Sequence, residues 1–376
     1  MADKENLFLY ITFIVFCSSA AIQLFYYLFY YLAVWFYKPT VNNTIRQPVS
    51  IIICARNEAE NLKKFLPAVL EQDYTDYEVI VVNDCSEDNS YLILGNYLLQ
   101  YPHLRISTVN KDPKFTHNKK FAQFIGIKAA KNDILLFTDA DCHPESDKWL
   151  ETMTSHFTEK TDFVLGYGGY INKKGVLNKY IRFDCLSIAM QYLGMAIRGI
   201  PYMGVGRNLA YRRSLFFANN GYGAHNHLIS GDDDLFVNSK ATKANTSVEF
   251  RKETHTRSVP SSDLKEWIIQ KKRHLTTAPY YRLRDKLILI IEPATRILFY
   301  ASFIMLLCCM YNWIWVSAVF ALRLLTQFTV YYLAQKKLNE PGLMPYLLFF
   351  DMFSPLLNGI LFVSNSGSKS GKNRWR

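Results

Sequence analysis

The sequence has few cysteines, and they follow no pattern. Seven occur in 376 residues, without the paired framework of a disulfide-stapled domain or the ligand spacing of a zinc site. Cys54, Cys85 and Cys142 lie in or just after expected buried strands, where a small thiol is an ordinary core side chain. We therefore expect the soluble part of the chain to face a reducing compartment.

Charged residues are absent from one long stretch near the N-terminus. None occurs between Glu5 and Lys38, and this run exceeds the roughly 20 residues that span a bilayer. A cleaved signal peptide is the alternative. It fits poorly, because the run is too long for an apolar signal core and no small-residue cleavage site follows. We predict a retained transmembrane anchor over residues 1–37.

The C-terminal part contains two more apolar regions. The first, residues 287–334, is too long for one span, and a break at residues 311–313 predicts a hairpin of two helices. Glu292 and Arg296 lie one helical turn apart within this region, so we expect their side chains to pair.

The other region, residues 343–363, is interrupted by prolines, a glycine and Asp351. If it crossed the bilayer, the basic pair 336–337 and the basic tail 365–376 would lie on opposite sides. That arrangement conflicts with the tendency of basic residues to stay cytoplasmic. We therefore expect residues 287–364 to combine transmembrane helices with an interfacial or re-entrant third segment.

The net charge of +11 is concentrated near the apolar regions. Residues 251–286 carry ten Lys and Arg against four Asp and Glu. A basic protein can bind nucleic acid, but basic residues beside apolar spans favour anionic lipid headgroups and diphosphates as partners. The sequence therefore predicts a membrane partner and no nucleic acid.

Between the apolar regions, residues 48–280 have the pattern of a soluble α/β domain. Val49–Cys54 is a continuous apolar, β-branched run, which is typical of a strand buried on both faces. Further strands are predicted at Tyr77–Val82 and Ile134–Thr138, and helices at Glu58–Glu71 and 119–130. This alternation predicts a mostly parallel sheet with right-handed crossovers.

Polar side chains follow three of the expected strands. Residues 56–58 come after the first strand, Asp84 ends the second, and Asp139 and Asp141 follow the third. The carboxyl ends of parallel strands form the ligand-binding edge of such sheets. Two carboxylates at positions i and i+2 can hold one divalent cation together with diphosphate oxygens. An isolated pair is usually a solvated turn, but its place after a buried strand favours a site.

Six motifs occur in a fixed order in the same region. They are Ser50–Glu58 (SIIICARNE), Val82–Ser90 (VNDCSEDNS), Phe137–Asp141 (FTDAD), Gly206–Arg213 (GRNLAYRR), Gly231–Leu235 (GDDDL) and Gln270–His274 (QKKRH). Their order and spacing resemble family 2 glycosyltransferases. The last motif resembles the Gln-x-x-Arg-Trp motif of membrane-bound members such as ceramide glucosyltransferases and polysaccharide synthases. The resemblance implies a GT-A nucleotide-sugar-binding fold, a UDP- or GDP-sugar donor, Mg²⁺ or Mn²⁺, and inversion at the anomeric carbon.

The resemblance also implies which residues bind the donor. Nucleotide-sugar contacts fall on Ala55, Arg56, Glu58, Asp84, Lys119 and Asp139. Lys119 matches a lysine that approaches the diphosphate, and Asp141 matches the direct metal ligand, with Asp139 beside it. Ordinary structural roles remain open for two of them. Glu58 could cap its helix, although Asn57 is better placed as the N-cap, and Asp84 could be a turn residue.

The acidic run 232–234 is expected to supply the catalytic base. Asp233 aligns with the second acid of the family motif, and Asp232 is the alternative base. The run could also be a solvated acidic turn without a catalytic role. An acceptor hydroxyl is a poor nucleophile at neutral pH, and a positioned carboxylate contributes roughly 10²–10⁴-fold. Arg273 is expected to help stabilise the leaving diphosphate, although the basic residues 271–273 could instead face the membrane surface.

Gln270, His274 and Asn208 are expected on the acceptor or diphosphate side. His274 departs from the family motif, which has Trp there, so the acceptor platform must differ. Residues 180–203 are largely apolar. They predict either a buried core helix or an interfacial helix that admits a lipid-linked acceptor.

The function expected from these features is the inverting transfer of one sugar from a UDP- or GDP-sugar to a hydroxyl. The acceptor would be a lipid or a lipid-linked glycan at the inner membrane face. Two alternatives remain at this point. One is a processive polysaccharide synthase, and the other is a non-catalytic nucleotide-sugar-binding scaffold.

Overall fold

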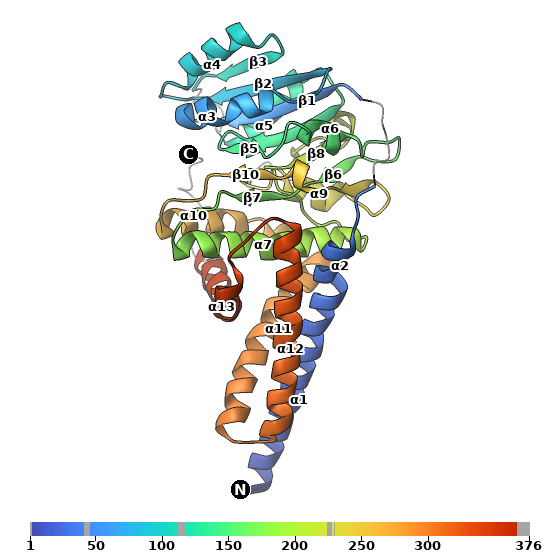
Figure 1. Ribbon diagram of the computed structural model, residues 1–376, viewed down its shortest axis with the longest axis vertical. Helices are drawn as coiled ribbons and strands as arrows, with labels where there is room; N and C mark the ends of the chain where they lie inside the picture. Colours follow the sequence, from blue (N-terminus) through green and yellow to red (C-terminus); the bar gives the residue numbers. More distant parts are fainter. Residues whose placement is uncertain (1, 41–45, 112–117, 224–227, 229, 367–376) are drawn as a thin grey trace.

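The computed structural model describes residues 2–40, 46–111, 118–223, 228 and 230–366. A mixed α/β domain stands on a group of long helices that contains both ends of the described chain (Figure 1). The basic tail expected over residues 365–376 lies outside the described residues from 367 onward.

A seven-stranded sheet forms the centre of the domain, in the order β3-β2-β1-β4-β8-β6-β9. Its strands are β1 (Val49–Ala55), β2 (Tyr77–Asp84), β3 (Leu104–Val109), β4 (Ile134–Asp139), β6 (Phe163–Leu165), β8 (Leu209–Arg212) and β9 (Thr246–Val248). β1 pairs in parallel with β2 and β4, and β8 runs antiparallel between β4 and β6. The strands predicted from the sequence and the mostly parallel sheet are confirmed.

Helices cover both faces of the sheet, which explains the unbroken apolar runs of its central strands. The helices of the domain are α3 (Ala59–Leu70), α4 (Ser90–Gln100), α5 (Lys119–Ala129), α6 (Trp149–Thr154), α8 (Arg213–Ala218), α9 (Asp234–Lys240) and α10 (Leu264–Leu275). Ile51 and Ile53 pack with α3 and α6 on one face, while Ile52 packs with α5 on the other. A Cβ at Gly126 of α5 would lie 2.7 Å from Ile52, so this glycine allows α5 to approach the sheet closely.

A second sheet of three short strands lies next to the first. It has the order β5-β10-β7, formed by Cys142–Pro144, Thr256–Ser258 and Gly168–Tyr170. β10 pairs antiparallel with β5, which places Ser258 opposite Cys142. Because Cys142 directly follows Asp141, this pairing carries Ser258 to the predicted metal ligand.

Among the described residues, four segments are long and apolar enough to cross a membrane: Glu5–Phe36, Leu283–Cys308, Trp313–Lys337 and Met344–Asn365. They contain α1 (Ala2–Phe25), a π-helical turn (Tyr26–Tyr31), α2 (Leu32–Phe36), α11 (Leu283–Cys308), α12 (Trp313–Lys337) and α13 (Leu347–Ser366). The predicted hairpin break is confirmed between α11 and α12. The predicted Glu292–Arg296 pair is also present, with Nε 3.1 Å from Oε1.

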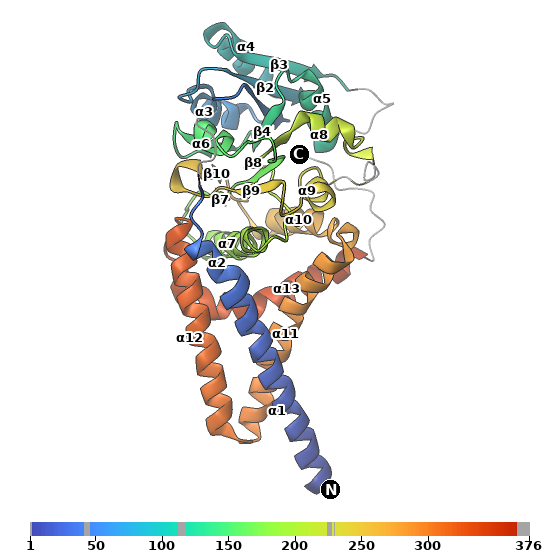
Figure 2. The same ribbon diagram turned by 90° about the vertical axis from the view of Figure 1, so that its right-hand side faces the viewer.

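α13 is oriented differently from the other long helices. α1, α11 and α12 pack against one another, whereas α13 lies obliquely below α7 and α10 (Figure 2). α13 has the length and composition of a span. The interfacial or re-entrant placement of residues 343–363 therefore stays a prediction.

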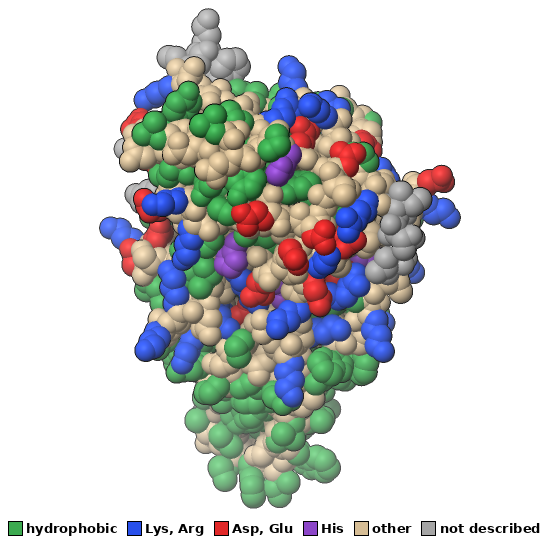
Figure 3. All heavy atoms as spheres, turned by 45° about the horizontal axis from the view of Figure 1, so that its top comes forward, with side chains coloured by type: hydrophobic (Ala, Val, Ile, Leu, Met, Phe, Trp, Pro, Cys, Tyr) green, Lys and Arg blue, Asp and Glu red, His purple; other side chains and the backbone are tan. Residues whose placement is uncertain are grey.

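The surface changes character along the molecule. Hydrophobic side chains cover the narrow end formed by the long helices, and Lys and Arg side chains gather just above it (Figure 3). An apolar end with a basic rim is the distribution expected where a protein meets lipid headgroups.

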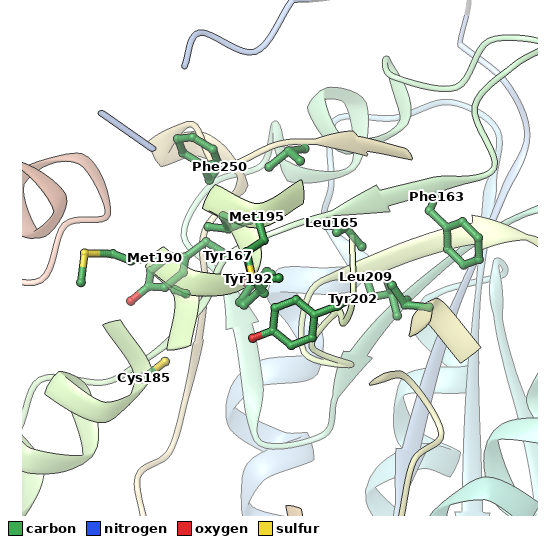
Figure 4. Close-up of a cluster of buried hydrophobic side chains, with 14 of the residues drawn as sticks. Phe163, Leu165, Tyr167, Cys185, Met190, Tyr192, Met195, Tyr202, Leu209 and Phe250 are labelled. Atoms are coloured by element: carbon green, nitrogen blue, oxygen red, sulfur yellow. The ribbon is translucent and has the colours of Figure 1, made fainter. Parts of the chain in front are cut away.

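α7 (Val176–Ile197) separates the domain from the long helices (Figure 1). Its buried side chains, among them Cys185, Met190 and Tyr192, pack in the main apolar cluster with residues of the sheet (Figure 4). A Cβ at Gly194 would clash with the carbonyl oxygen of Tyr30, so α7 and the N-terminal helix touch through their backbones. The core-helix interpretation of residues 180–203 therefore holds for this face of α7.

Candidate active site

The strands β1, β2 and β4 end at one edge of the sheet, and the predicted donor-side residues lie there. Ala55 ends β1 opposite Asn83, and Asp139 ends β4 beside Cys54. Asp84 ends β2 and is fully buried. The expectation that the polar strand ends share one edge is confirmed, since the three strands are parallel neighbours.

The loop after β1 is held by the loop after β2. Asn57 has a left-handed backbone, with φ of 56°, and its Oδ1 accepts a hydrogen bond from the Glu87 N–H at 2.8 Å. The N–H of Ala59, the first residue of α3, donates to Asp88 Oδ2 at 2.9 Å. The prediction that Asn57 caps α3 is therefore wrong, because a carboxylate from the neighbouring loop provides the acceptor.

Glu58 lies close to the predicted metal carboxylates. Burial, together with the nearby charges of Asp141 and Asp139, raises the pKa of Glu58 to about 7. Its Oε2 accepts a hydrogen bond from Asn61 at 2.6 Å, and its side chain makes no cap bond to α3. Arg56 precedes it in the same partly exposed loop.

Asp139, Asp141 and Cys142 form a group whose possible ligand atoms all lie within 4.8 Å of one another. Ser258 Oγ donates to Asp141 Oδ2 at 2.7 Å, which orients that carboxylate. Burial and the charge of Asp139 raise the pKa of Asp141. Burial also raises the pKa of Cys142 well above its usual value. The oxygens, and not the protonated thiol, therefore fit a hard cation such as Mg²⁺ or Mn²⁺.

Lys119 links these carboxylates to the acidic run 232–234. Its ammonium lies 2.7 Å from Asp139 Oδ1 and 3.6 Å from Asp232 Oδ2. These carboxylates hold the pKa of Lys119 well above its usual value despite its burial. Asn118 caps α5 by accepting from the Phe121 N–H at 2.9 Å, which fixes Lys119 in the first turn.

The carboxylate of Asp233 is held by backbone N–H groups. The N–H of Gly206 donates to its Oδ2, and the N–H of Asp234 lies 3.1 Å from its Oδ1. Burial and the charge of Asp232 raise the pKa of Asp233 to about 7, against the opposing effect of Lys119. A carboxylate with a pKa near neutrality is suited to accepting a proton there.

Asp234, in contrast, has a structural role. Its Oδ2 accepts hydrogen bonds from Thr277 Oγ1 at 2.6 Å and from the Tyr281 hydroxyl at 2.7 Å. Asp232 is buried beside Lys119. The three acids thus have separate environments, and the solvated-turn explanation does not fit them.

α10 brings the Gln270–His274 motif to the same place. Gln270, Arg273 and His274 line one cavity with the carboxylates. Lys271 also lines the cavity and is held by Asp184 of α7, with Nζ 2.8 and 2.6 Å from its two oxygens. Desolvation by the surrounding protein, and then the charges of Arg273 and Lys271, keep the pKa of His274 well below its usual value.

Asn208 does not reach this cavity. Its Nδ2 donates to the backbone oxygens of Tyr167 and Thr254, at 2.9 and 2.6 Å, and its Oδ1 accepts from Trp149 Nε1 at 3.0 Å. The predicted contact of Asn208 with acceptor or diphosphate is wrong, because these three partners hold the side chain in the interior. Its neighbour Arg207, which the sequence reasoning missed, lines the cavity and lies over the Tyr170 ring at 4.3 Å.

The cavity has a volume of about 760 Å³ and joins two chemically different regions. One end is lined by predicted site residues: Lys119, Asp139, Asp141, Asp232, Asp233, Gln270, Arg273 and His274. The other end is lined by α11 and α13, with the apolar residues Ile290, Pro293, Ile297, Pro355 and Phe362 beside the polar residues Lys286, Glu292, Arg296, Ser354 and Asn358. Ala55, Arg56, Glu58 and Asp84 lie at the strand ends outside this lining.

Part of the polar end of the cavity, including Lys119, Asp139 and Asp141, lies in a region that matches a known family. Residues 50–217 match the family model for glycosyl transferase family 2. The glycosyltransferase AglE of Haloferax volcanii is 37% identical over 105 residues, covering 27% of this chain and 33% of that protein. WfaP of Escherichia coli, a UDP-Glc:α-D-GlcNAc-diphosphoundecaprenol β-1,3-glucosyltransferase, is 24% identical over 174 residues, covering 41% of this chain and 65% of that protein. The chain therefore spans a third to two thirds of the length of these relatives.

The whole architecture also has a solved counterpart. The mannosyltransferase PcManGT of Pyrobaculum calidifontis, solved with GDP-Man and Mn²⁺, superposes with a TM-score of 0.64 at 18% identity. The superposition covers 96% of this chain and 99% of that one, which shows a shared fold. The finer resemblance to ceramide glucosyltransferases is not supported, since the family match ends before the 270–274 motif on which it rested.

The strand-end site, the sheet order, the family match and the superposition agree, and the chain contains a family 2 glycosyltransferase domain of the GT-A fold.

Proposed function

We propose that this protein transfers one sugar, with inversion, from a UDP- or GDP-sugar to a hydroxyl of a lipid or lipid-linked glycan. The observation that carries the proposal is the continuous cavity from Asp233 to the membrane helices α11 and α13. In this proposal residues 48–280 form the catalytic domain, and 1–37 and 287–364 hold it at the membrane.

The donor would lie along the carboxyl ends of β1, β2 and β4. Ala55, Arg56, Glu58 and Asp84 border the place for the nucleoside, and Asp139 and Asp141 face its diphosphate. Mg²⁺ or Mn²⁺ held by these two carboxylates would neutralise charge that develops on the leaving diphosphate. The bound GDP-Man and Mn²⁺ of PcManGT make the same pairing of nucleotide sugar and metal plausible for this fold.

Asp233 would act as the general base. Its carboxylate accepts the proton of the acceptor hydroxyl while the hydroxyl oxygen bonds to the anomeric carbon, and the nucleoside diphosphate leaves from the opposite face. The raised pKa, about 7, makes Asp233 a stronger base than an ordinary Asp. Arg273 and Lys119 are placed to stabilise the negative charge of the departing diphosphate.

The acceptor would enter from the membrane. Ile290 and Ile297 of α11 and Phe362 of α13 offer apolar surface in the cavity lining, and an aliphatic chain can be buried against it at a gain of about 0.8 kcal/mol per methylene. The name of WfaP gives a diphosphoundecaprenol acceptor for that relative, which is consistent with such an end. A single transfer is favoured because His274 replaces the tryptophan of the family motif.

We place the domain on the cytoplasmic side. The basic pair Lys336 and Lys337 ends α12 next to the domain, and Lys337 Nζ lies 5.7 Å from the Phe250 ring centre. The rim of basic side chains lies on that side as well (Figure 3). Basic residues flanking spans are retained in the cytoplasm.

The activity is tested by nucleotide release from a panel of UDP- and GDP-sugars. Full-length protein in detergent is assayed with Mg²⁺ or Mn²⁺, with and without membrane lipid extract, beside Asp141→Asn and Asp233→Asn. We expect turnover of one donor, and its loss in both variants while they remain folded. The proposal fails if no donor turns over with lipid present, or if both variants match the wild type. In that case the non-catalytic scaffold becomes the better explanation.

The sidedness is tested by thiol labelling of intact cells. Cys308 ends α11, Cys309 follows it, and both are exposed. This end of the α11–α12 hairpin lies opposite the domain (Figure 1). We expect a membrane-impermeant maleimide to label these two cysteines from outside, and labelling to vanish when both are changed to Ser. Labelling that persists in the double variant would place the domain outside the cell.

A further inference from the structure

Glu340 belongs to the turn after α12, yet its carboxylate is inside the α/β domain. The residue is 1% exposed. Its Oε1 accepts from the Tyr167 hydroxyl at 2.8 Å and from Arg257 Nη1, and its Oε2 accepts from Arg182 Nε at 2.7 Å. One side chain from the turn after α12 therefore contacts β10, α7 and the segment before β7.

The same two arginines hold the backbone of this turn. Arg257 Nη2 donates to the carbonyl of Asn339 at 3.0 Å, and Arg182 Nη2 donates to that of Pro341 at 3.0 Å. Gly169 provides the space, because a Cβ there would lie 2.7 Å from Glu340 Oε1 and would clash with Arg257. The turn is thus built into the domain and does not only rest on its surface.

Arg257 connects this cluster to the metal site. It occupies the centre of β10, and the next residue, Ser258, donates to Asp141 Oδ2 at 2.7 Å. The N–H of Val259 donates to the backbone oxygen of Asp141 at 3.2 Å. Any shift of β10 along its own axis would therefore move both contacts to Asp141.

The charges of the cluster are balanced only when Glu340 is present. Arg257 Nε also lies 3.2 Å from Glu145 Oε2, so two arginines face two carboxylates. Removing one partner of a buried ion pair leaves an uncompensated charge that the structure must relieve by moving or admitting water. Without Glu340, Arg182 would lose its carboxylate partner and Arg257 would keep only Glu145. A shift of Arg257 toward Glu145 would carry β10 with it, because Arg257 is the central residue of that strand.

We propose that Glu340 is a positioning residue for the metal site, acting through Arg257 and Ser258 on Asp141. The inference rests on the metal site of the proposed function. It adds that the turn between α12 and α13 orients a metal ligand, so that this part of the chain does more than anchor the domain.

The test is Mn²⁺ binding by the full-length protein in detergent. Free Mn²⁺ is followed by electron paramagnetic resonance in the presence of UDP or GDP, without acceptor. Glu340→Gln is compared with Ser258→Ala, which removes the direct partner of Asp141. The control is Glu249→Gln, an equally buried carboxylate paired with His156 and Arg251. Unfolding midpoints without metal are measured for all of them.

We expect Glu340→Gln and Ser258→Ala to weaken Mn²⁺ binding on the order of tenfold, since partners of metal ligands typically contribute 10–100-fold. Glu249→Gln should bind Mn²⁺ as the wild type does, whatever its effect on stability. Wild-type affinity in Glu340→Gln, or equal weakening in Glu249→Gln, would overturn the inference.

A milder variant covers the case in which Glu340→Gln does not fold. Tyr167→Phe removes one hydrogen bond from Glu340 Oε1 and keeps the ring. Its Mn²⁺ affinity should fall at least twofold, and wild-type affinity would refute the inference. If the wild type itself binds no Mn²⁺, the metal site is wrong and the role of Glu340 falls with it. That outcome differs from selective failure of the Glu340 variants.

Discussion

The backbone N–H of Gly206 donates a hydrogen bond to the carboxylate of Asp233. A Cβ at Gly206 would lie 2.7 Å from Asp233 Oδ2, inside van der Waals contact. Gly206→Ala should therefore push Asp233, the proposed base, away from the proposed position of the acceptor hydroxyl. We expect kcat to fall by roughly ten- to a hundredfold, the cost of a displacement of about 1 Å, with little change in the KM for the donor.

The matched control for this substitution is Gly95→Ala. Gly95 is in the middle of α4, and nothing lies within 4 Å of the position of an added Cβ. Alanine there should leave kcat unchanged and stabilise the helix by about 0.5–1 kcal/mol. A normal kcat in Gly206→Ala would show that the Gly206 contact does not place the base.

The pH dependence of activity should follow the Asp233 carboxyl. Because its pKa is raised from 3.8 to about 7, the basic form is lost as the pH falls below 7, and kcat/KM should drop about tenfold per pH unit there. Stability should change in the opposite sense. The folded protein holds this proton more tightly than the unfolded chain, so the contribution of Asp233 to stability grows as the pH falls from about 7 toward 4.

Glu58 also has a pKa of about 7, so the pH profile of kcat/KM must be assigned to one of the two carboxyls. In Glu58→Gln the midpoint of the kcat/KM profile should remain near 7 if Asp233 is the base. If the midpoint disappears in this variant, Glu58 and not Asp233 is the group that controls the pH profile.

Asp351 of α13 should contribute strongly to the stability of the long apolar helices. Its carboxylate lies 2.8 Å from Arg323 Nη2 and 3.1 Å from Arg296 Nη1, and both Asp351 and Arg323 are fully buried. Asp351→Asn leaves buried guanidinium charge uncompensated and should lower the free energy of unfolding by about 3–5 kcal/mol. The loss is measured as a fall in the thermal unfolding midpoint in detergent.

The double variant Asp351→Leu with Arg323→Met provides the comparison. It removes both charges of the central pair and should lose less stability than Asp351→Asn alone. A double variant that is less stable than the single one would mean that hydrogen bonds to Tyr27 and Tyr300 contribute more than the charge balance.

Blocking the apolar end of the cavity should abolish acceptor binding and leave donor binding intact. Ile290 of α11 lines that end, and Ile290→Trp would fill it. We expect transfer to the lipid extract to fall strongly while the slow, acceptor-independent hydrolysis of the donor persists. Leu298→Trp, at an exposed position of the same helix outside the cavity lining, should transfer normally. Equal transfer by both variants would exclude this end as the lipid site.

The sequence was most informative where one physical pattern decides the outcome. Buried parallel strands require continuous apolar runs, so β1, β2 and β4 and the polar residues at their ends could be predicted. It was less informative where a side chain has several possible partners. Asn57 looked like a helix cap, but the acceptor came from Asp88, and Asn208 is in a family motif but bonds to Trp149. Glu340 gave no sequence signal, because its partners lie 83, 158 and 173 residues away.

The backbone contact between Gly194 and Tyr30, together with the packing of α7 under the sheet, fixes α7 between the domain and the N-terminal helix. If Asp233 is the base, its carboxylate would then stay at a constant height above the lipid headgroups. Such an enzyme would select acceptors by the distance of their hydroxyl from the membrane. A hydroxyl carried at the right height would be glycosylated, whereas the same sugar one residue farther from the membrane would pass over the base unreacted.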